Sequence, residues 1–221
     1  MPLFDLVILA LIQGITEFLP ISSSGHLVLW PLVTGRPDQG VTLDVAVHLG
    51  TLVAVCLYFR RDVGRIAAGA GDLARGRPRS ADAQLALLLA LATVPAVAAG
   101  LALKLAGALE GLRAIAVVGW ATLLGGLLLW LADRLGGERR TGADWGWRDA
   151  ALMGLAQALA LVPGTSRAGA CMTMARALGY GRAEGARLAL LMAVPVIAAA
   201  AAAEIAGLLA AGDLRLGADF A

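Results

Sequence analysis

The sequence contains few charged residues and few cysteines. Only 15% of its 221 residues are charged, against about 25% in an average soluble domain. The formal net charge of +2 gives no reason to expect a nucleic-acid partner. The cysteines, Cys56 and Cys171, lie in apolar stretches, so we expect buried thiols rather than a disulfide. No basic region precedes the first apolar residues, and we therefore expect no cleaved signal peptide.

Apolar residues, in contrast, are abundant and occur in blocks. They make up 59% of the chain, and the mean hydropathy is +0.79. This composition predicts an all-α integral membrane protein, a polytopic helical bundle. Stretches close to the ~20 residues of a membrane span are Leu43–Phe59, Gln84–Leu103, Leu112–Ala132 and Ala186–Ala211. The charged segments 60–82 and 133–149 are predicted to be loops, and 213–221 a short tail.

The stretch 13–26 places polar groups inside an apolar segment: an amide, a carboxylate, three consecutive hydroxyls and an imidazole. Lipid solvates none of them, so each needs a partner or a water-filled cavity. Gln13 and Glu17 are four residues apart and would share a helix face, which Pro20 then ends. The apolar arms on either side are too short to span a bilayer: Leu3–Ile12 and Leu27–Val33. The pattern predicts a re-entrant helix–turn–helix.

A second break, at 163–169, interrupts the apolar segment Ala150–Leu178 and repeats this pattern. Pro20 to Ser24 and Pro163 to Arg167 share the form Pro-x-[Ser/Thr]-Ser-x at an offset of 143. Three spans separate the turns, so we predict inverted-topology repeats. These would occupy 1–135 and, incompletely, 150–221 of a single membrane domain, 1–221; the counterpart of the second span would begin near 227. The alternative is that two Pro-Ser turns arose independently.

Positive charge is distributed unevenly between the two predicted membrane faces. The loops hold ten arginines, and three more join them if the second broken segment also re-enters: Arg60, Arg61, Arg65, Arg75, Arg77, Arg79, Arg134, Arg139, Arg140, Arg148, Arg176, Arg182 and Arg187. The opposite face has four basic residues: Arg36, Lys104, Arg113 and Arg215. This asymmetry predicts that the arginine-rich loops are cytoplasmic. The first turn would then enter from the outer side.

The two turns carry a family resemblance. Residues 13–26 resemble the first signature of the bacterial undecaprenyl-diphosphate phosphatase family, also called bacitracin resistance protein, and 163–169 are similar to the second. The segment 43–51 resembles the region between them, although Ala168 stands where a serine is common. The resemblance implies a multi-pass protein of the bacterial inner membrane. It would hydrolyse undecaprenyl (polyprenyl) diphosphate to the monophosphate and inorganic phosphate, recycle the lipid carrier for peptidoglycan, and confer bacitracin resistance.

Phosphate hydrolysis needs charge neutralisation, a nucleophile and proton transfer. Arg167 is expected to clamp phosphate through its planar fork, the alternative being an arginine that snorkels at a helix end. Ser23 is the candidate nucleophile, by resemblance and by its central place in the turn. His26 could activate Ser23, protonate the leaving group or itself attack phosphorus. Phosphate-binding hydroxyls and turn N–H groups are expected at Ser22, Ser24, Gly25, Thr165 and Ser166, with at least one serine serving only as a helix cap.

Glu17 is costly inside a membrane and so implies a cation or an ion pair. With Gln13 it could hold Mg²⁺ or Ca²⁺, which favour oxygen ligands; the alternative is a Glu17–Arg167 pair without metal. His48 is expected to support the site, and Glu204 receives no role. A transporter or flippase for a phosphorylated polyprenyl lipid is the second functional class, since inverted repeats are common in transporters. Expected partners are the lipid substrate, membrane lipids and, in a homodimer, a second copy.

Overall fold

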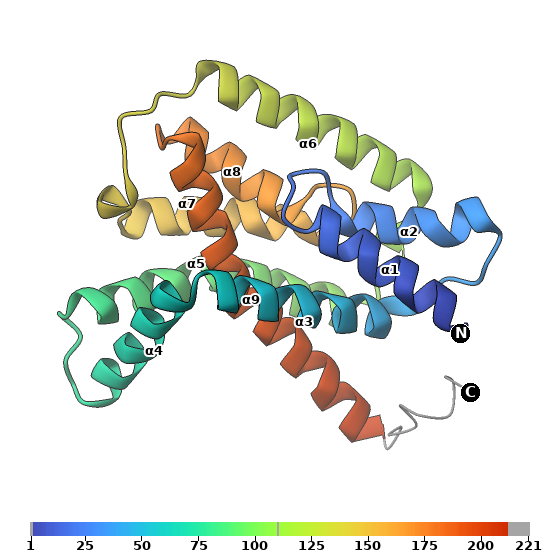
Figure 1. Ribbon diagram of the computed structural model, residues 1–221, viewed down its shortest axis with the longest axis horizontal. Helices are drawn as coiled ribbons and strands as arrows, with labels where there is room; N and C mark the ends of the chain where they lie inside the picture. The colour runs from blue at the N-terminus through green and yellow to red at the C-terminus, as the bar shows by residue number, and fades with distance from the viewer. Residues whose placement is uncertain (1, 110, 212–221) are drawn as a thin grey trace.

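The computed structural model describes residues 2–109 and 111–211, and in these ranges the chain is helical, with no strand (Figure 1). The predicted tail 213–221 lies outside the described residues. The α-helices are α1 (Leu3–Thr16), α2 (Ser23–Thr34), α3 (Gly40–Tyr58), α4 (Arg60–Ala74), α5 (Ala81–Leu105), α6 (Ile115–Leu135), α7 (Trp147–Ala158), α8 (Arg167–Ala177) and α9 (Arg182–Ala211).

Four of these helices, α3, α5, α6 and α9, are long and apolar enough to cross a membrane. Each overlaps one of the predicted spans, with ends shifted by at most a few residues, so the predicted spans are confirmed. Ser80 shows how one such end is set, because its hydroxyl accepts the Ala83 N–H at 3.0 Å and caps the start of α5. The remaining helices have at most fifteen residues, too few for a complete span.

The short helices form two hairpins that open in opposite directions. In Figure 1, α1 and α2 open toward the right, where the N-terminus lies, and α7 and α8 open toward the left. The arginine-rich segments 60–82 and 136–146 lie at the left end, and the start of α6 lies at the right end. Both turns lie in the middle of the molecule. This is the arrangement predicted for two re-entrant segments entering from opposite faces.

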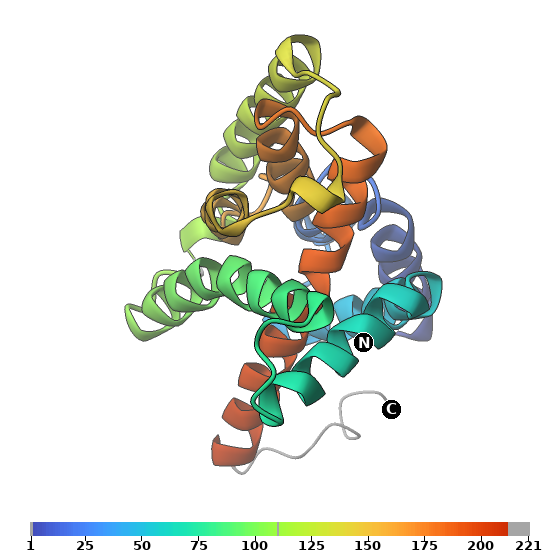
Figure 2. The same cartoon turned by 90° about the vertical axis from the view of Figure 1, so that its left-hand side faces the viewer.

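The segment 60–82 is not the predicted loop, because its first fifteen residues form α4. One side of this helix packs on α5 through half-buried Val63, Ile66 and Leu73. Gly69 makes the packing close: a Cβ there would lie 2.1 Å from the Asp82 carbonyl oxygen. The arginines therefore hide an amphipathic helix, which folds back along α5 at the arginine-rich end (Figure 2).

The structure corrects the register of the internal repeat from 143 to 144. Ser22 and Ser166 both precede a helix, both have a positive φ (63° and 62°), and both cap an N–H three residues on. At the same offset, Gln157 corresponds to Gln13. The prolines alone are 143 apart, because the second turn holds one more residue between its proline and its capping serine. The predicted offset was therefore one residue short both before and after the prolines.

The same register of 144 relates two buried aspartates at the start of the hairpins. Asp5, 2% exposed, accepts a hydrogen bond from Arg36. Asp149, 4% exposed, accepts one from the Tyr180 hydroxyl at 2.6 Å and one from Arg140. Tyr180 stands 144 residues after Arg36, so the equivalent aspartates are held by equivalent positions. Each buried carboxylate thereby ties the opening helix of its hairpin to the segment that follows the hairpin.

Candidate active site

The two turns touch at the centre of the molecule. The Gly164 N–H donates to the Ser22 hydroxyl at 3.1 Å, and the same hydroxyl oxygen accepts the Gly25 N–H at 3.2 Å. In the second turn, the Ser166 hydroxyl accepts the Gly169 N–H at 3.1 Å. Helices α2 and α8 therefore both begin at this contact, and the positive ends of their dipoles lie there. This arrangement favours a bound anion.

Glycine is required where the turns approach each other. Gly164 has φ +100°, and a Cβ there would lie 2.4 Å from the Val118 carbonyl oxygen of α6. A Cβ on Gly25 would lie 3.4 Å from the Gly164 Cα, close to an ordinary contact distance, so the requirement for glycine applies to Gly164. Serines 22 and 166, in contrast, hold their positive φ with a side chain present, a conformation that costs about 1–3 kcal/mol. Strain of this kind is typical of functional turns.

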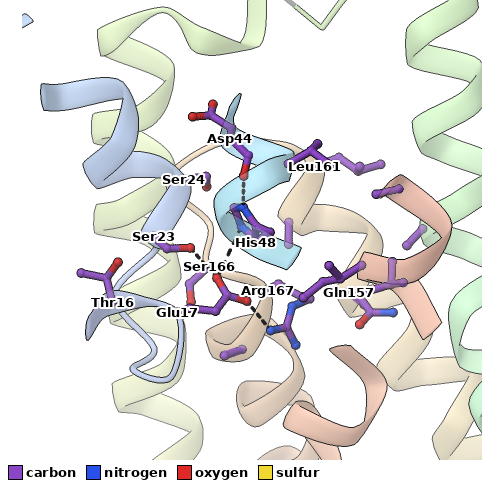
Figure 3. A pocket seen from close by; sticks show the side chains of 17 residues that line it. Thr16, Glu17, Ser23, Ser24, Asp44, His48, Gln157, Leu161, Ser166 and Arg167 are labelled. Carbon is purple, nitrogen blue, oxygen red and sulfur yellow. Dashed lines mark hydrogen bonds and ion pairs between the residues drawn. The ribbon is translucent and has the colours of Figure 1, made fainter. Parts of the chain in front are cut away.

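Glu17 is the charged centre of the site (Figure 3). It is 6% exposed, and its Oε2 accepts the Ser23 hydroxyl at 2.6 Å and the Gln13 amide at 3.1 Å. Its Oε1 accepts a guanidinium N–H of Arg167 at 2.6 Å. His48 Nε2 lies 3.5 Å from Oε2. The predicted Glu17–Arg167 ion pair is present, and it brings the first turn's carboxylate to the second turn's cation.

Arg167 is fixed by more than this pair. Another of its guanidinium nitrogens donates to the Ala189 carbonyl oxygen of α9 at 2.9 Å, so the side chain is held between α9 and the first turn. A guanidinium has five N–H donors, and these two contacts use two of them. Three donors remain on a side chain that lines the cavity described next.

A cavity of about 230 Å³ lies beside this cluster. Its polar end is formed by Glu17, Ser23, His48 and Arg167, which Figure 3 shows converging on one another. Its other walls come from α3, α5, α9 and the end of α7, and are mainly small or aliphatic: Val45, Ala96, Ala160, Leu161, Val196, Ile197 and Ala200. The cavity therefore combines a compact charged end with an apolar surface, as an amphiphile requires.

The other residues predicted for the site are distributed less simply. Ser24 and Ser166 line the cavity, whereas Thr165 and Gly25 are not among its lining residues in the described chain. Gln13 is fully buried behind Glu17, where its amide also reaches the Thr51 hydroxyl at 3.4 Å. The hydroxyl of Ser22 is the helix cap expected among the serines.

His26 does not approach the Ser23 hydroxyl as the sequence suggested. Its Nδ1 lies 2.8 Å from the Ser22 carbonyl oxygen, and it is not among the cavity-lining residues of the described chain. The Ser23 hydroxyl donates its hydrogen bond to the Glu17 carboxylate instead. Geometry thus favours the carboxylate as the base for Ser23, and the catalytic role of His26 stays a prediction.

Sequence reasoning underweighted His48 and did not consider Asp44 or Gln157 as part of the site. His48 Nδ1 lies 2.6 Å from the Asp44 carbonyl oxygen, which can only accept, so Nδ1 carries the proton and Nε2 faces Glu17. Gln157 lines the cavity and donates to the Ala92 carbonyl oxygen at 3.2 Å. The available signals were an imidazole within an apolar span and a glutamine at the repeat position of Gln13.

Potential metal ligands at or behind the polar end of the cavity are the Glu17 carboxylate, the Gln13 amide oxygen and the Nε2 atom of His48. The described residues contain no group of three or more His, Cys, Asp or Glu side chains suited to a metal. The Gln13 Oε1 atom is buried without a hydrogen-bond partner among these residues, whereas the Nε2 atom of the same amide donates to the Glu17 carboxylate. This donor set fits a hard cation only if further oxygens come from a ligand and water.

Comparison with known proteins places the chain in a family. The model of the bacitracin resistance protein BacA family matches residues 6–218. The undecaprenyl-diphosphatase of Roseobacter denitrificans is 52% identical over 219 residues, 99% of this chain and 82% of that protein. That of Ruegeria pomeroyi is 55% identical over 199 residues, 90% of this chain and 74% of the relative. The undecaprenyl-diphosphatase 1 of Rhodospirillum rubrum is 51% identical over 208 residues, which is 91% of this chain and 73% of the relative. The chain belongs to the bacitracin resistance protein BacA family.

Proposed function

We propose that the chain is an undecaprenyl-diphosphate phosphatase of the bacterial inner membrane, which converts the lipid diphosphate to the monophosphate and inorganic phosphate. The observation that carries this proposal is the Glu17 carboxylate, held between the Ser23 hydroxyl and the Arg167 guanidinium at 2.6 Å each. Relatives at about half identity bear the corresponding enzyme name. Recycling of the lipid carrier and bacitracin resistance follow from this reaction.

The cavity explains how such a substrate would bind. The diphosphate would lie at the polar end, against Arg167 and the N-termini of α2 and α8. The prenyl chain would run along the aliphatic side chains of α5 and α9 and leave between helices into the bilayer. A charged diphosphate loses water when it enters the cavity. In this pose, the fixed positive groups of Arg167 and the helix N-termini would take the place of that water.

In the first chemical step, the Ser23 oxygen attacks the terminal phosphorus while Glu17 takes the hydroxyl proton. The P–O bond to the inner phosphate breaks, and undecaprenyl phosphate leaves with the bonding electron pair. Arg167 stabilises the charge that develops on the equatorial oxygens. Glu17 then gives its proton to the departing undecaprenyl phosphate and is a carboxylate again. In the second step, Glu17 takes a proton from water as the water oxygen attacks the phosphoserine; the P–O bond to Ser23 breaks, the Ser23 oxygen receives that proton from Glu17, and inorganic phosphate is released.

We also propose that a divalent cation, Mg²⁺ or Ca²⁺, assists this reaction. Glu17, with Gln13 behind it, would hold the ion together with oxygens of the diphosphate and water. When bound, such an ion supplies charge neutralisation for the phosphate oxygens. The unpartnered Gln13 oxygen supports the proposal, and the contact of Glu17 with Arg167 limits how much negative charge is left for the ion.

The active site is proposed to open toward the outer, periplasmic side. Its cavity is lined by Asp44 near the start of α3 and by Ala200 in the second half of α9, and both lie toward the end opposite the arginine-rich segments. Arginine-rich segments tend to stay on the cytoplasmic side, so the opposite end of the molecule would face the periplasm. A homodimer stays a prediction, testable by mass measurement in detergent.

The deciding experiment is phosphate release by the purified chain from undecaprenyl diphosphate, with and without a chelator. We expect one phosphate per lipid and a rate that chelation lowers and Mg²⁺ or Ca²⁺ restores. A variant with Ser23→Ala serves as the inactive control. Intact lipid binding without phosphate release under any cation would instead favour the transporter, for which the described residues offer no specific feature.

A further inference from the structure

The hairpin formed by α4 and the turn before α5 exposes an unusual number of unpaired arginines. All six arginines between residues 60 and 79 are exposed. Within the described chain, only Arg65 has a carboxylate within 4.0 Å, that of Asp82 at 2.8 Å. The other five form what we call the arginine hairpin: Arg60, Arg61, Arg75, Arg77 and Arg79.

Four of the other seven arginines predicted for the same membrane face pair with carboxylates in the described chain. Those with a carboxylate partner pair as follows: Arg140 with Asp149, Arg176 and Arg182 with Asp133, and Arg187 with Asp62. Arg134 stacks over the Trp130 ring at 5.4 Å. Orienting the protein requires only positive charge on this face. The orientation therefore does not explain why five arginines without a carboxylate partner are concentrated in one hairpin, when three are spread over the other described segments of this face.

Side chains next to the hairpin indicate its depth in the bilayer. Leu57 and Tyr58, at the end of α3, are 66% and 81% exposed, and Arg60 follows directly. An exposed tyrosine at the end of a spanning helix marks the level of the lipid head groups. The apolar side of α4 is meanwhile occupied by α5, so the helix presents arginines, alanines and glycines outward. The hairpin thus lies on the head-group layer without inserting deeply.

We propose that the arginine hairpin binds anionic phospholipid head groups of the leaflet on the arginine-rich side. The ligand is inferred from charge complementarity. The phosphate groups of anionic lipids are the negative groups at the depth of the hairpin, and arginine binds phosphate well. No hairpin residue lines the catalytic cavity in the described chain, so this site is separate from the diphosphate site. The inference does not depend on the proposed function.

The test compares two variants that remove the same charge. The full chain, purified in a non-ionic detergent, is titrated with phosphatidylglycerol or phosphatidylcholine, and bound lipid is counted by native mass spectrometry. The hairpin variant is Arg75→Gln with Arg77→Gln, in the turn. The control is Arg139→Gln with Arg148→Gln; both residues are exposed on the same face outside the hairpin and without a carboxylate within 4.0 Å among the described residues.

We expect the wild-type chain to prefer phosphatidylglycerol, with an affinity that falls as salt rises. The hairpin variant should bind phosphatidylglycerol on the order of 10-fold more weakly, while the control keeps most of the preference. Equal losses in the two variants would show that overall charge, rather than the hairpin, attracts the lipid, and would overturn the proposal. An absent lipid preference in the wild-type chain would do the same. Phosphate release is not measured, so failure of the enzyme proposal is separately visible.

Discussion

The two central turns share a backbone design but carry different chemistry. Each has a serine with positive φ that caps the helix following it, and each begins a short helix at the same point in space. Yet position 17 is a glutamate in the first turn, whereas its counterpart 144 residues later is Leu161. Ser23 likewise corresponds to Arg167. One turn supplies the carboxylate and the hydroxyl, and the other supplies the cation.

This difference shows that neither repeat contains a complete site. A buried carboxylate without its cation would be costly, and so would the cation without the carboxylate. The free-energy cost of burying each charge in a membrane is offset only where the two turns meet and the charges pair. The repeats therefore contribute equivalent backbones and complementary side chains. Substitutions that remove what is particular to one turn should lower activity or stability by different amounts, given below from the largest to the smallest.

The largest effect is expected from Ser23→Ala, which leaves the first turn with no hydroxyl facing Glu17. Phosphate release should fall on the order of 10⁴-fold, as for the loss of other serine nucleophiles. Thr34→Ala is the matched control, because this hydroxyl at the other end of α2 donates to the Trp30 carbonyl oxygen at 2.7 Å and is not among the cavity-lining residues of the described chain. The control should stay within a few-fold of wild type in a steady-state assay.

Trapping the intermediate separates the candidate nucleophiles. If Ser23 attacks, denatured enzyme quenched during turnover should carry a phosphoserine that is stable in acid and labile in strong base. An acid-labile phosphate mapped to His26 would reverse the roles of the two residues and leave the phosphatase standing. Turnover with no trapped phosphate, together with residual activity in Ser23→Ala, would indicate direct attack by water.

Glu17→Gln should lower phosphate release by about 10³-fold, because it removes the base for Ser23 and the partner of Arg167. The response to Mg²⁺ or Ca²⁺ should disappear with it. Glu204→Gln is the control: this second membrane carboxylate accepts the Thr42 hydroxyl at 2.6 Å, away from the cavity lining. A Glu17→Gln variant that still responds to a chelator would place the ion elsewhere.

Arg167→Lys keeps the charge of the second turn but removes the fork that contacts Glu17 and Ala189 together. Turnover should fall about 10²-fold or more. The same change at Arg176, in the same helix, tests structure instead: its guanidinium is 4% exposed and binds Asp133 and several carbonyl oxygens. That variant should lose thermal stability while the folded fraction keeps its rate. Equal rate losses in both would refute the clamp.

Much of this architecture could be predicted from the sequence, because a membrane imposes simple length and charge rules. The four spans, the two broken helices and the meeting of Glu17 with Arg167 were all expected. Helix α4 was missed because its arginines mask a narrow apolar stripe that becomes visible only against α5. The density of arginines in this segment predicted a loop, whereas the segment forms an amphipathic helix.

The details of the site depended on geometry that spacing does not encode. His26 lies within one helical turn of Ser23 in sequence, but its ring turns back to the Ser22 carbonyl oxygen. His48, distant in sequence, reaches Glu17 because α3 packs against α1. Similarly, the one-residue difference in the repeat register arises because the second proline stands one position earlier between its glutamine and its capping serine, so an alignment on the prolines gives the wrong offset.

The smallest expected effect compares the two capping serines. Ser166→Ala removes one cap bond, that of Gly169, and should lower stability by about 1 kcal/mol. Ser22→Ala removes the equivalent bond to Gly25 and also the acceptor of the Gly164 N–H, so it should cost about 1–3 kcal/mol more. Because both positions share the same positive φ, backbone strain cancels in the comparison. Thermal unfolding of each variant in detergent measures the difference. Equal losses would mean that the hydrogen bond between the Gly164 N–H and the Ser22 hydroxyl contributes nothing to stability, and that the packing of helices such as α5 on α7 holds the two repeats together without it.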